Sequence, residues 1–70
     1  MIVRVQHLRL VTGYNPRPGI CAKGARQWFE SRGWDWRDFV RNGVDADRLR
    51  ATGDAFAIAL ADAAEAQHGQ

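Results

Sequence analysis

One short pattern, which occurs twice at positions ten residues apart, constrains the fold of this chain more than any other feature. Residues 33–35 and 43–45 each read glycine, an apolar residue and aspartate. Glycine adopts the positive φ that ends a helix, and aspartate caps the first turn of the next one. An apolar residue also follows each aspartate by four positions, where it can pack against the apolar residue before the cap. Each repeat therefore predicts a tight corner between two helices. Two such corners predict short helices in a compact cluster rather than a long bundle.

Glycine and aspartate also mark the remaining helix boundaries. Gly33 and Gly53 are placed to end helices, and Asp54 is placed to cap the last one. Before the first corner the pattern becomes helical from Ile20 onward. We therefore expect helices over residues 20–32, 35–43, 45–53 and 54–67.

Apolar residues at helical spacing predict which faces of these helices are buried. Trp28 and Phe29 fall on one face of the first helix, and Phe56, Leu60 and Ala63 follow one stripe of the last. A chain of 70 residues has room for one modest core. The expected fold is therefore a single, mainly α domain, in which a compact cluster of three to four short helices follows one N-terminal β-strand.

The N-terminal segment predicts that strand. From Ile2 to Gln6 the residues alternate, with Val3 and Val5 on one side and Arg4 on the other, as in a half-buried strand. The sequence holds no second strand signal, yet a strand cannot satisfy its backbone alone. We expect it to pair with a partner chain, with a second copy of this chain, or with a short extended piece that carries no signal. Either of the first two would make the strand an interaction element.

A short turn and a loop follow the strand. Leu8 and Val11 fit a single helical turn that ends near Gly13. Residues 14–19 contain two prolines and a glycine, which exclude a helix and favour an exposed loop. The expected layout is strand and turn over 1–13, loop over 14–19 and helical cluster over 20–67.

Composition limits how so small a domain gains stability. Apolar residues form 46% of the chain and three of them are Trp, so the chain is not compositionally disordered. Cys21 is the only cysteine and cannot form an internal disulfide. His7 and His68 lie far apart and no Cys–His pair has metal-ligand spacing, so we expect no metal and no cofactor. A partner protein or an efficient core must then supply the stability.

Charge and hydropathy bear on the class of partner. No apolar run approaches the roughly 20 residues that span a membrane, so we expect no membrane partner and an intracellular, reducing location. The net charge of +2 is uneven, because residues 1–41 carry +5 and residues 42–70 carry −3. This asymmetry suits a basic face for nucleic acid, or complementary surfaces in an assembly.

Catalysis is not expected. A nucleophilic mechanism would need Cys21 activated by His7 or His68, together with an orienting carboxylate. A chain of this size also has little room to enclose a substrate pocket of several hundred cubic ångströms. We therefore expect a non-enzymatic protein with no small-molecule substrate.

A DNA-binding helix–turn–helix over residues 21–43 is the alternative. With Gly33 at the ninth, turn position of such a motif, Phe29 falls fifth, Arg32 eighth and Asn42 eighteenth. These side chains do not suit close packing of the two helices, where small or apolar residues are needed. The second helix also carries acids in its first turn, which would repel phosphates. The motif therefore ranks below protein binding.

Aromatic and basic residues interleave around the first corner, as they do in stacking platforms for single-stranded nucleic acid. Trp28 lies on the apolar face of its helix and Trp34 stands directly before a helix cap, so both have structural roles. Trp36 has no such role. Trp and Arg are enriched where proteins contact one another. The candidate partner-binding residues are therefore Val3, Arg4, Val5, Arg17, Trp36, Arg37 and Arg41.

The run over residues 21–29, followed by 33–36, Phe39, Gly43 and 51–55, resembles a group of very small proteins encoded in bacterial prophages. The resemblance covers most of residues 1–66, and residues 15–19 depart from it as an insertion. It rests on cap and core positions, so it implies a shared fold and no catalytic residue.

The resemblance further implies a phage origin and a place among virion tail or assembly proteins. The expected function is that of a small phage structural or assembly protein that docks on virion or tail proteins. Its expected location is the bacterial host cytoplasm or the assembled virion. A small DNA-binding phage regulator is the alternative function.

Overall fold

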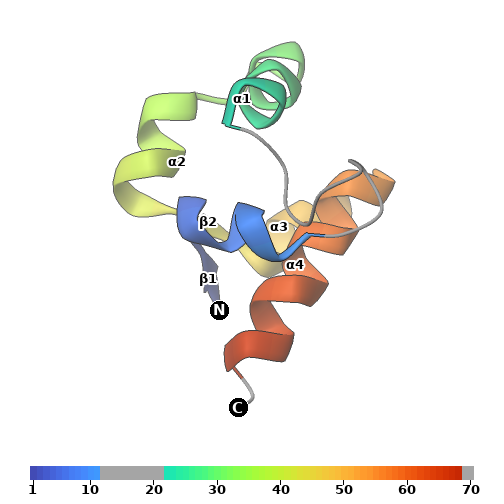
Figure 1. Cartoon of the computed structure of the whole chain (residues 1–70). Coiled ribbons are helices and arrows are strands. Elements are labelled where there is room, and N and C mark those ends of the chain that lie inside the picture. The colour runs from blue at the N-terminus through green and yellow to red at the C-terminus, as the bar shows by residue number, and fades with distance from the viewer. Residues whose placement is uncertain (12–21, 69–70) are drawn as a thin grey trace.

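The computed structural model describes residues 1–11 and 22–68, and it shows a mostly helical cluster with one short pair of strands (Figure 1). The expected mainly α fold with an N-terminal strand is thus confirmed. The loop expected over residues 14–19 lies outside the described residues. The helices are η1 (Val5–Leu10, a 3₁₀ helix), α1 (Ala22–Ser31), α2 (Trp36–Asn42), α3 (Ala46–Ala51) and α4 (Ala55–His68), and the strands are β1 (Ile2–Val3) and β2 (Val44–Asp45).

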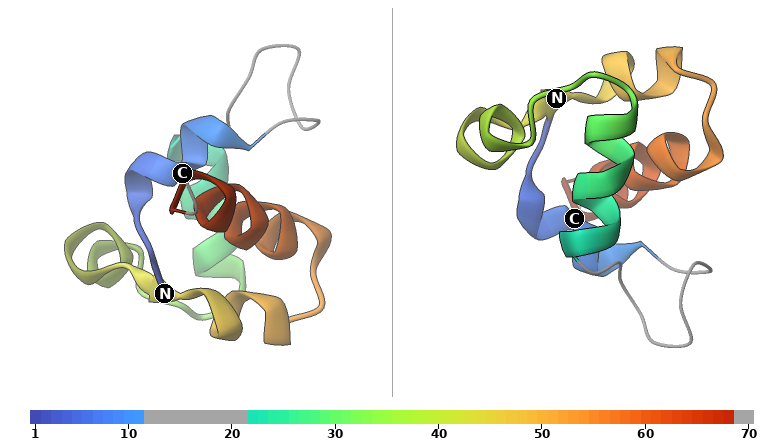
Figure 2. Two further views of the ribbon diagram at one scale, coloured as in Figure 1. Left: turned by 90° about the horizontal axis from the view of Figure 1, so that it is seen from below. Right: turned by 90° about the horizontal axis from the view of Figure 1, so that it is seen from above.

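The two strands form an antiparallel pair in which Ile2 lies opposite Asp45 and Val3 lies opposite Val44. Of the three possible partners for the N-terminal strand, the structure therefore shows the short extended piece within the same chain. The backbone N–H of Ala46 also donates a hydrogen bond to the carbonyl oxygen of the first residue, at 3.0 Å. The N-terminus consequently lies beside the link between α2 and α3 in both views of Figure 2.

The prediction that the strand continues to Gln6 is wrong, because η1 begins at Val5. β2 is only two residues long, because α2 ends just before it and α3 begins directly after it. A longer β1 would therefore have no strand to pair with. At the start of η1 the imidazole Nδ1 of His7 accepts the backbone N–H of Arg4 at 2.8 Å. The alternation still describes burial, because Val3 is buried and Val5 half-buried whereas Arg4 and Gln6 are exposed.

The predicted helix ends and caps are confirmed within the described residues. Asp35, Asp45 and Asp54 accept hydrogen bonds from backbone N–H groups in the first turns of α2, α3 and α4, at 2.9 to 3.3 Å. Three glycines after α1, α2 and α3 have positive φ, and they are Gly33, Gly43 and Gly53. Local capping therefore sets where each helix begins and ends.

The core is closed by α4, which packs against η1, β1 and α3. Phe56 and Leu60 are buried there as predicted, but Ala63 is only half-buried. Three other alanines of α4 are completely buried, and they are Ala57, Ala61 and Ala64. Because alanine has a small side chain, this face lets neighbouring elements approach α4 closely. The buried stripe is therefore wider than the sequence predicts, and it is built from small residues.

Phe29 of α1 lies at the centre of the aromatic packing. Its ring centroid is 4.4 Å from that of Phe39 and 5.6 Å from that of Trp34. The two apolar residues that flank the Asp35 cap therefore both pack against Phe29. This arrangement holds α1 and α2 at a sharp corner and places the outer side of α2 in solvent.

Candidate protein-docking face and the adjoining pocket

The structure separates the candidate partner-binding residues. Val3 is fully buried, and Val5 is half-buried against the core, so these two side chains serve the fold and Val3 has no surface to offer a partner. Arg4 is exposed at the start of η1. Arg17 lies outside the described residues. The remaining three candidates all lie on α2.

Trp36, Arg37, Val40 and Arg41 form one continuous outward surface of α2, which we call the α2 face. Residues three and four positions apart are neighbours on a helix, so each of the four adjoins at least one other. Phe39 is turned into the core and is 2% exposed, whereas Val40 is 47% exposed. The structure thus brings three of the predicted residues together around an exposed apolar side chain.

Trp36 is anchored in the fold. It is half-buried, and its ring centroid lies 5.6 Å from that of Phe29 and 5.4 Å from that of Phe39. The interpretation that Trp36 alone lacks a structural role is therefore wrong, because the first turn of α2 brings its indole against the aromatic core. Its exposed part remains at the edge of the α2 face, held in a fixed orientation.

Two apolar residues near this surface escaped the sequence interpretation. Val40 is one, and its position one helical turn after Trp36 could have identified it. Ile2 is the other, and it is 45% exposed. Its Cγ2 lies only 2.5 Å from where a Cβ would stand on Gly43, at the C-terminal end of α2. Only the pairing of β1 with β2 reveals this proximity.

Six basic side chains in the described part of the chain make no ion pair with a carboxylate. Arg26, Arg32 and Arg50 do make such pairs, and a hydrogen bond from Arg50 lowers the pKa of Glu65. The six are Arg4, Arg9, Lys23, Arg37, Arg41 and Arg48. Two of them belong to the α2 face, so that surface combines an apolar centre with two positive charges that have no paired carboxylate.

The other two tryptophans, Trp28 and Trp34, belong to an aromatic cluster between α1 and the start of α4. The Trp28 ring lies edge-to-face against Trp34 and Phe56, with centroids 5.5 and 5.1 Å away. The guanidinium of Arg32 covers Trp28 at 5.0 Å and donates to the Asp54 carboxylate at 2.8 Å. These rings are occupied by the fold and do not form an open stacking platform for bases.

Asp54 links this cluster to the start of α4. Burial alone would raise the pKa of its carboxyl group, but hydrogen bonds from the Phe56 N–H, Arg32 and Trp28, with the Arg32 charge, lower the pKa overall. The carboxylate is therefore stabilised in its charged form by the helix that it caps and by the cluster that it joins.

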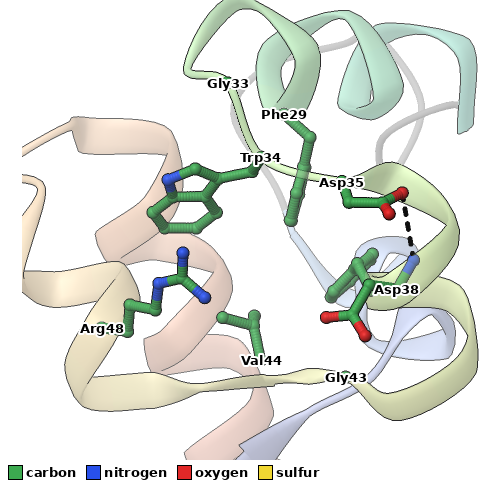
Figure 3. A pocket seen from close by; sticks show the side chains of 9 residues that line it. Phe29, Gly33, Trp34, Asp35, Asp38, Gly43, Val44 and Arg48 are labelled. Carbon is green, nitrogen blue, oxygen red and sulfur yellow. Dashed lines mark hydrogen bonds between the residues drawn. The ribbon is translucent and has the colours of Figure 1, made fainter.

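A pocket of about 260 Å³ opens between α2 and α3 (Figure 3). It lies on the flank of α2 that carries Asp38, away from Val40. Across it, Asp38 faces Arg48, whose guanidinium stacks on the Trp34 ring at 4.4 Å from the centroid. Phe29, Phe39 and Val44 lie buried behind it, and the half-buried Trp34 ring forms one of its walls.

Two other hollows in the described part of the chain have less to offer a ligand. One of about 480 Å³ is lined by Ser31, Arg32, Trp34 and Thr52. Its hydroxyls donate to backbone carbonyls within the fold and Arg32 holds Asp54, so its polar groups are already engaged. The second, of about 340 Å³, is lined by the η1 and α4 surface and carries no charged group.

Neither a metal site nor an unpaired buried polar side-chain atom is present in the described residues. They contain no group of three His, Cys, Asp or Glu side chains that could hold a metal ion, and every buried side-chain N or O among them has a hydrogen-bond partner. No described helix is long and apolar enough to cross a membrane. Cys21 and the His68 side chain lie outside the described residues.

No protein-family model matches this chain, and neither does any curated protein or solved structure.

Proposed function

We propose that this chain is a non-catalytic binding module that docks on another protein through the α2 face, as a small structural or assembly component of a phage particle. The observation that carries the docking proposal is the exposed Val40, bordered on one helix surface by Arg37, Arg41 and the edge of Trp36. The phage setting rests on the resemblance of most of residues 1–66 to small prophage proteins.

The chemistry of the α2 face indicates what it would bind. An apolar centre gains free energy when it is removed from water, and it does so against an apolar patch on a partner. The two arginines beside it have no paired carboxylate in the described chain, so acidic side chains on the partner would complement them. Trp36 is already held against Phe29 and Phe39, so its ordering costs little on binding. The expected partner surface is therefore an apolar patch with acidic neighbours.

DNA binding through α2 is less well supported. Asp35 caps the helix and Asp38 stands in its first turn, so two carboxylates occupy the end that a recognition helix directs at bases and phosphates. An exposed valine between the arginines also has no role in a phosphate contact. The mixed apolar and basic character of the face favours a protein.

Incorporation into phage particles tests the proposal. A tagged copy of the chain is expressed in a lysogen that carries its gene, the prophage is induced, and the chain is quantified in purified particles and assembly intermediates. Val40→Asp and the pair Arg37→Glu with Arg41→Glu should each reduce incorporation roughly tenfold or more, as loss of a binding hot spot does. Ile58→Asp and Arg9→Glu are matched controls, since these exposed residues lie on other elements.

Two outcomes would contradict the proposal. Incorporation of Val40→Asp at the wild-type level would show that the α2 face is not the docking surface. Absence of the wild-type chain from particles and intermediates, together with duplex DNA binding that weakens steeply with salt, would favour the DNA-binding alternative.

A further inference from the structure

The pocket between α2 and α3 has features that docking through the α2 face does not use. It lies on the opposite flank of α2, so the α2 face and the pocket can be tested separately. Its volume of about 260 Å³ is below the range of pockets that hold drug-sized ligands. The occupant would therefore be a small molecule of the size of one amino acid.

Arg48 provides one end of this pocket with a fixed cation. Its guanidinium lies over the Trp34 ring at 4.4 Å, and no carboxylate of the described chain pairs with it. Stacking holds the plane of a guanidinium while its N–H groups stay available at the edge. That edge matches a carboxylate, which accepts two parallel hydrogen bonds.

Asp38 provides the opposite end with an anion (Figure 3). Its Oδ1 accepts a hydrogen bond from the Asn42 amide at 2.8 Å, which fixes the side chain, and Oδ2 has no hydrogen bond within the described chain. Asp38 and Arg48 both line the pocket, and they form no ion pair with each other. A molecule that satisfies both must carry an anionic group at one end and a hydrogen-bond donor, best a cation, at the other.

We propose that this pocket binds a free α-amino acid, with its carboxylate on Arg48 and its ammonium group on Asp38. Phe39 and Val44 are buried beneath the pocket, so the half-buried Trp34 ring is the apolar surface that the side chain of the ligand would contact, and an aliphatic side chain suits that surface better than a polar one. The molecule would be a ligand and not a substrate, since the pocket presents no nucleophile.

Titration of the labelled protein with leucine and two blocked forms tests this proposal. The indole N–H signal of Trp34 in two-dimensional nuclear magnetic resonance reports on the pocket, and a Trp34→Phe variant assigns it among the signals of the three tryptophans. N-acetyl-leucine removes the positive charge, and leucine amide removes the carboxylate. Leucine should produce a saturable shift, and each blocked form should bind roughly tenfold or more weakly, as expected when a hydrogen bond to a charged group is lost.

Variants of the two charged residues identify the contacts. Arg48→Gln should remove saturable leucine binding, and Arg48→Lys should weaken it, because an ammonium group lacks the planar fork of arginine. Asp38→Asn keeps an oxygen for Asn42 and should make leucine and N-acetyl-leucine bind equally. Arg9→Gln, at an exposed position on η1, is the matched control outside the pocket, and circular dichroism checks that every variant is folded. If Arg48→Gln does not fold, Arg48→Lys and Asp38→Asn still decide the result.

Ionic strength is matched in all titrations, because exposed charges are screened by salt. The proposal is overturned if the Trp34 signal does not saturate with leucine, if either blocked form binds as well as leucine, or if folded Arg48→Gln still binds it. A loss of leucine binding in Asp38→Asn and Arg48→Gln with normal particle incorporation would support the pocket independently of the docking proposal.

Discussion

Val3 lies directly opposite Val44 in the antiparallel strand pair, and both side chains are buried in the core. The first residues of the chain are therefore joined to the corner between α2 and α3. This contact connects two segments that are distant in sequence. It makes the N-terminal strand a part of the core, whereas its neighbour Ile2 faces solvent.

Val3→Ala is expected to lower the free energy of unfolding by about 1.5–3 kcal/mol, since a fully buried valine loses its contacts. Ile2→Ala, on the outer side of the same strand, should change it by much less. Thermal or urea denaturation followed by circular dichroism compares the two. Equal losses of unfolding free energy in the two variants would contradict the assignment of Val3 to the buried face of β1 and Ile2 to the exposed face.

Gly43→Ala should destabilise the chain far more than Gly53→Ala. Gly43 has φ 78° and ψ −172°, a conformation that only glycine adopts readily, and a Cβ there would stand 2.7 Å from the Val3 carbonyl oxygen. Gly53 also has positive φ, but a Cβ on it would meet no atom within 4 Å. We expect about 1–2 kcal/mol for Gly53→Ala, from backbone strain alone. Similar melting temperatures for the two variants would contradict this difference.

Loss of a helix cap should be measurable in a domain with so small a core. Asp35→Ala and Asp45→Ala are each expected to cost about 0.5–2 kcal/mol, because each removes an acceptor of backbone N–H groups. Asp35→Asn and Asp45→Asn should retain most of the stability, since asparagine also caps helices. Unchanged thermal melts for both alanine variants would show that these caps do not hold α2 and α3.

Asp54 should contribute to the acid sensitivity of the fold. Its pKa lies below the usual value of 3.8 in the folded chain, so the unfolded chain binds a proton more readily. The stabilisation is complete above about pH 4 and is lost as the pH falls through the folded pKa. Asp54→Asn keeps the cap but loses the charge, so its stability should fall less between neutral pH and pH 3.

Asp47→Asn is the control for that comparison, because Asp47 makes no ion pair in the described chain. The loss of stability at acid pH should be reduced more in Asp54→Asn than in this control. A wild-type acid profile for Asp54→Asn would contradict the role of the Asp54 charge.

The helix boundaries follow from the sequence because their causes are local. A cap such as Asp35 bonds N–H groups two or three residues ahead, and a glycine such as Gly43 permits a turn at its own position. Both effects act within one turn of helix, so neither requires knowledge of distant contacts. The α2 surface with Arg37 and Arg41 could be anticipated for the same reason.

Tertiary structure alone decided the features that join distant parts of the chain. The two residues of β2 have no strand pattern of their own, and they become a strand only because β1 lies beside them. The position of Ile2 at the end of α2 follows from that pairing, as does the early end of the predicted strand. Likewise Trp36 packs on Phe29 from another helix, and Arg48 meets Trp34 across a corner. Capping and helical periodicity describe neighbours along the chain, whereas these contacts depend on how the helices fold against one another.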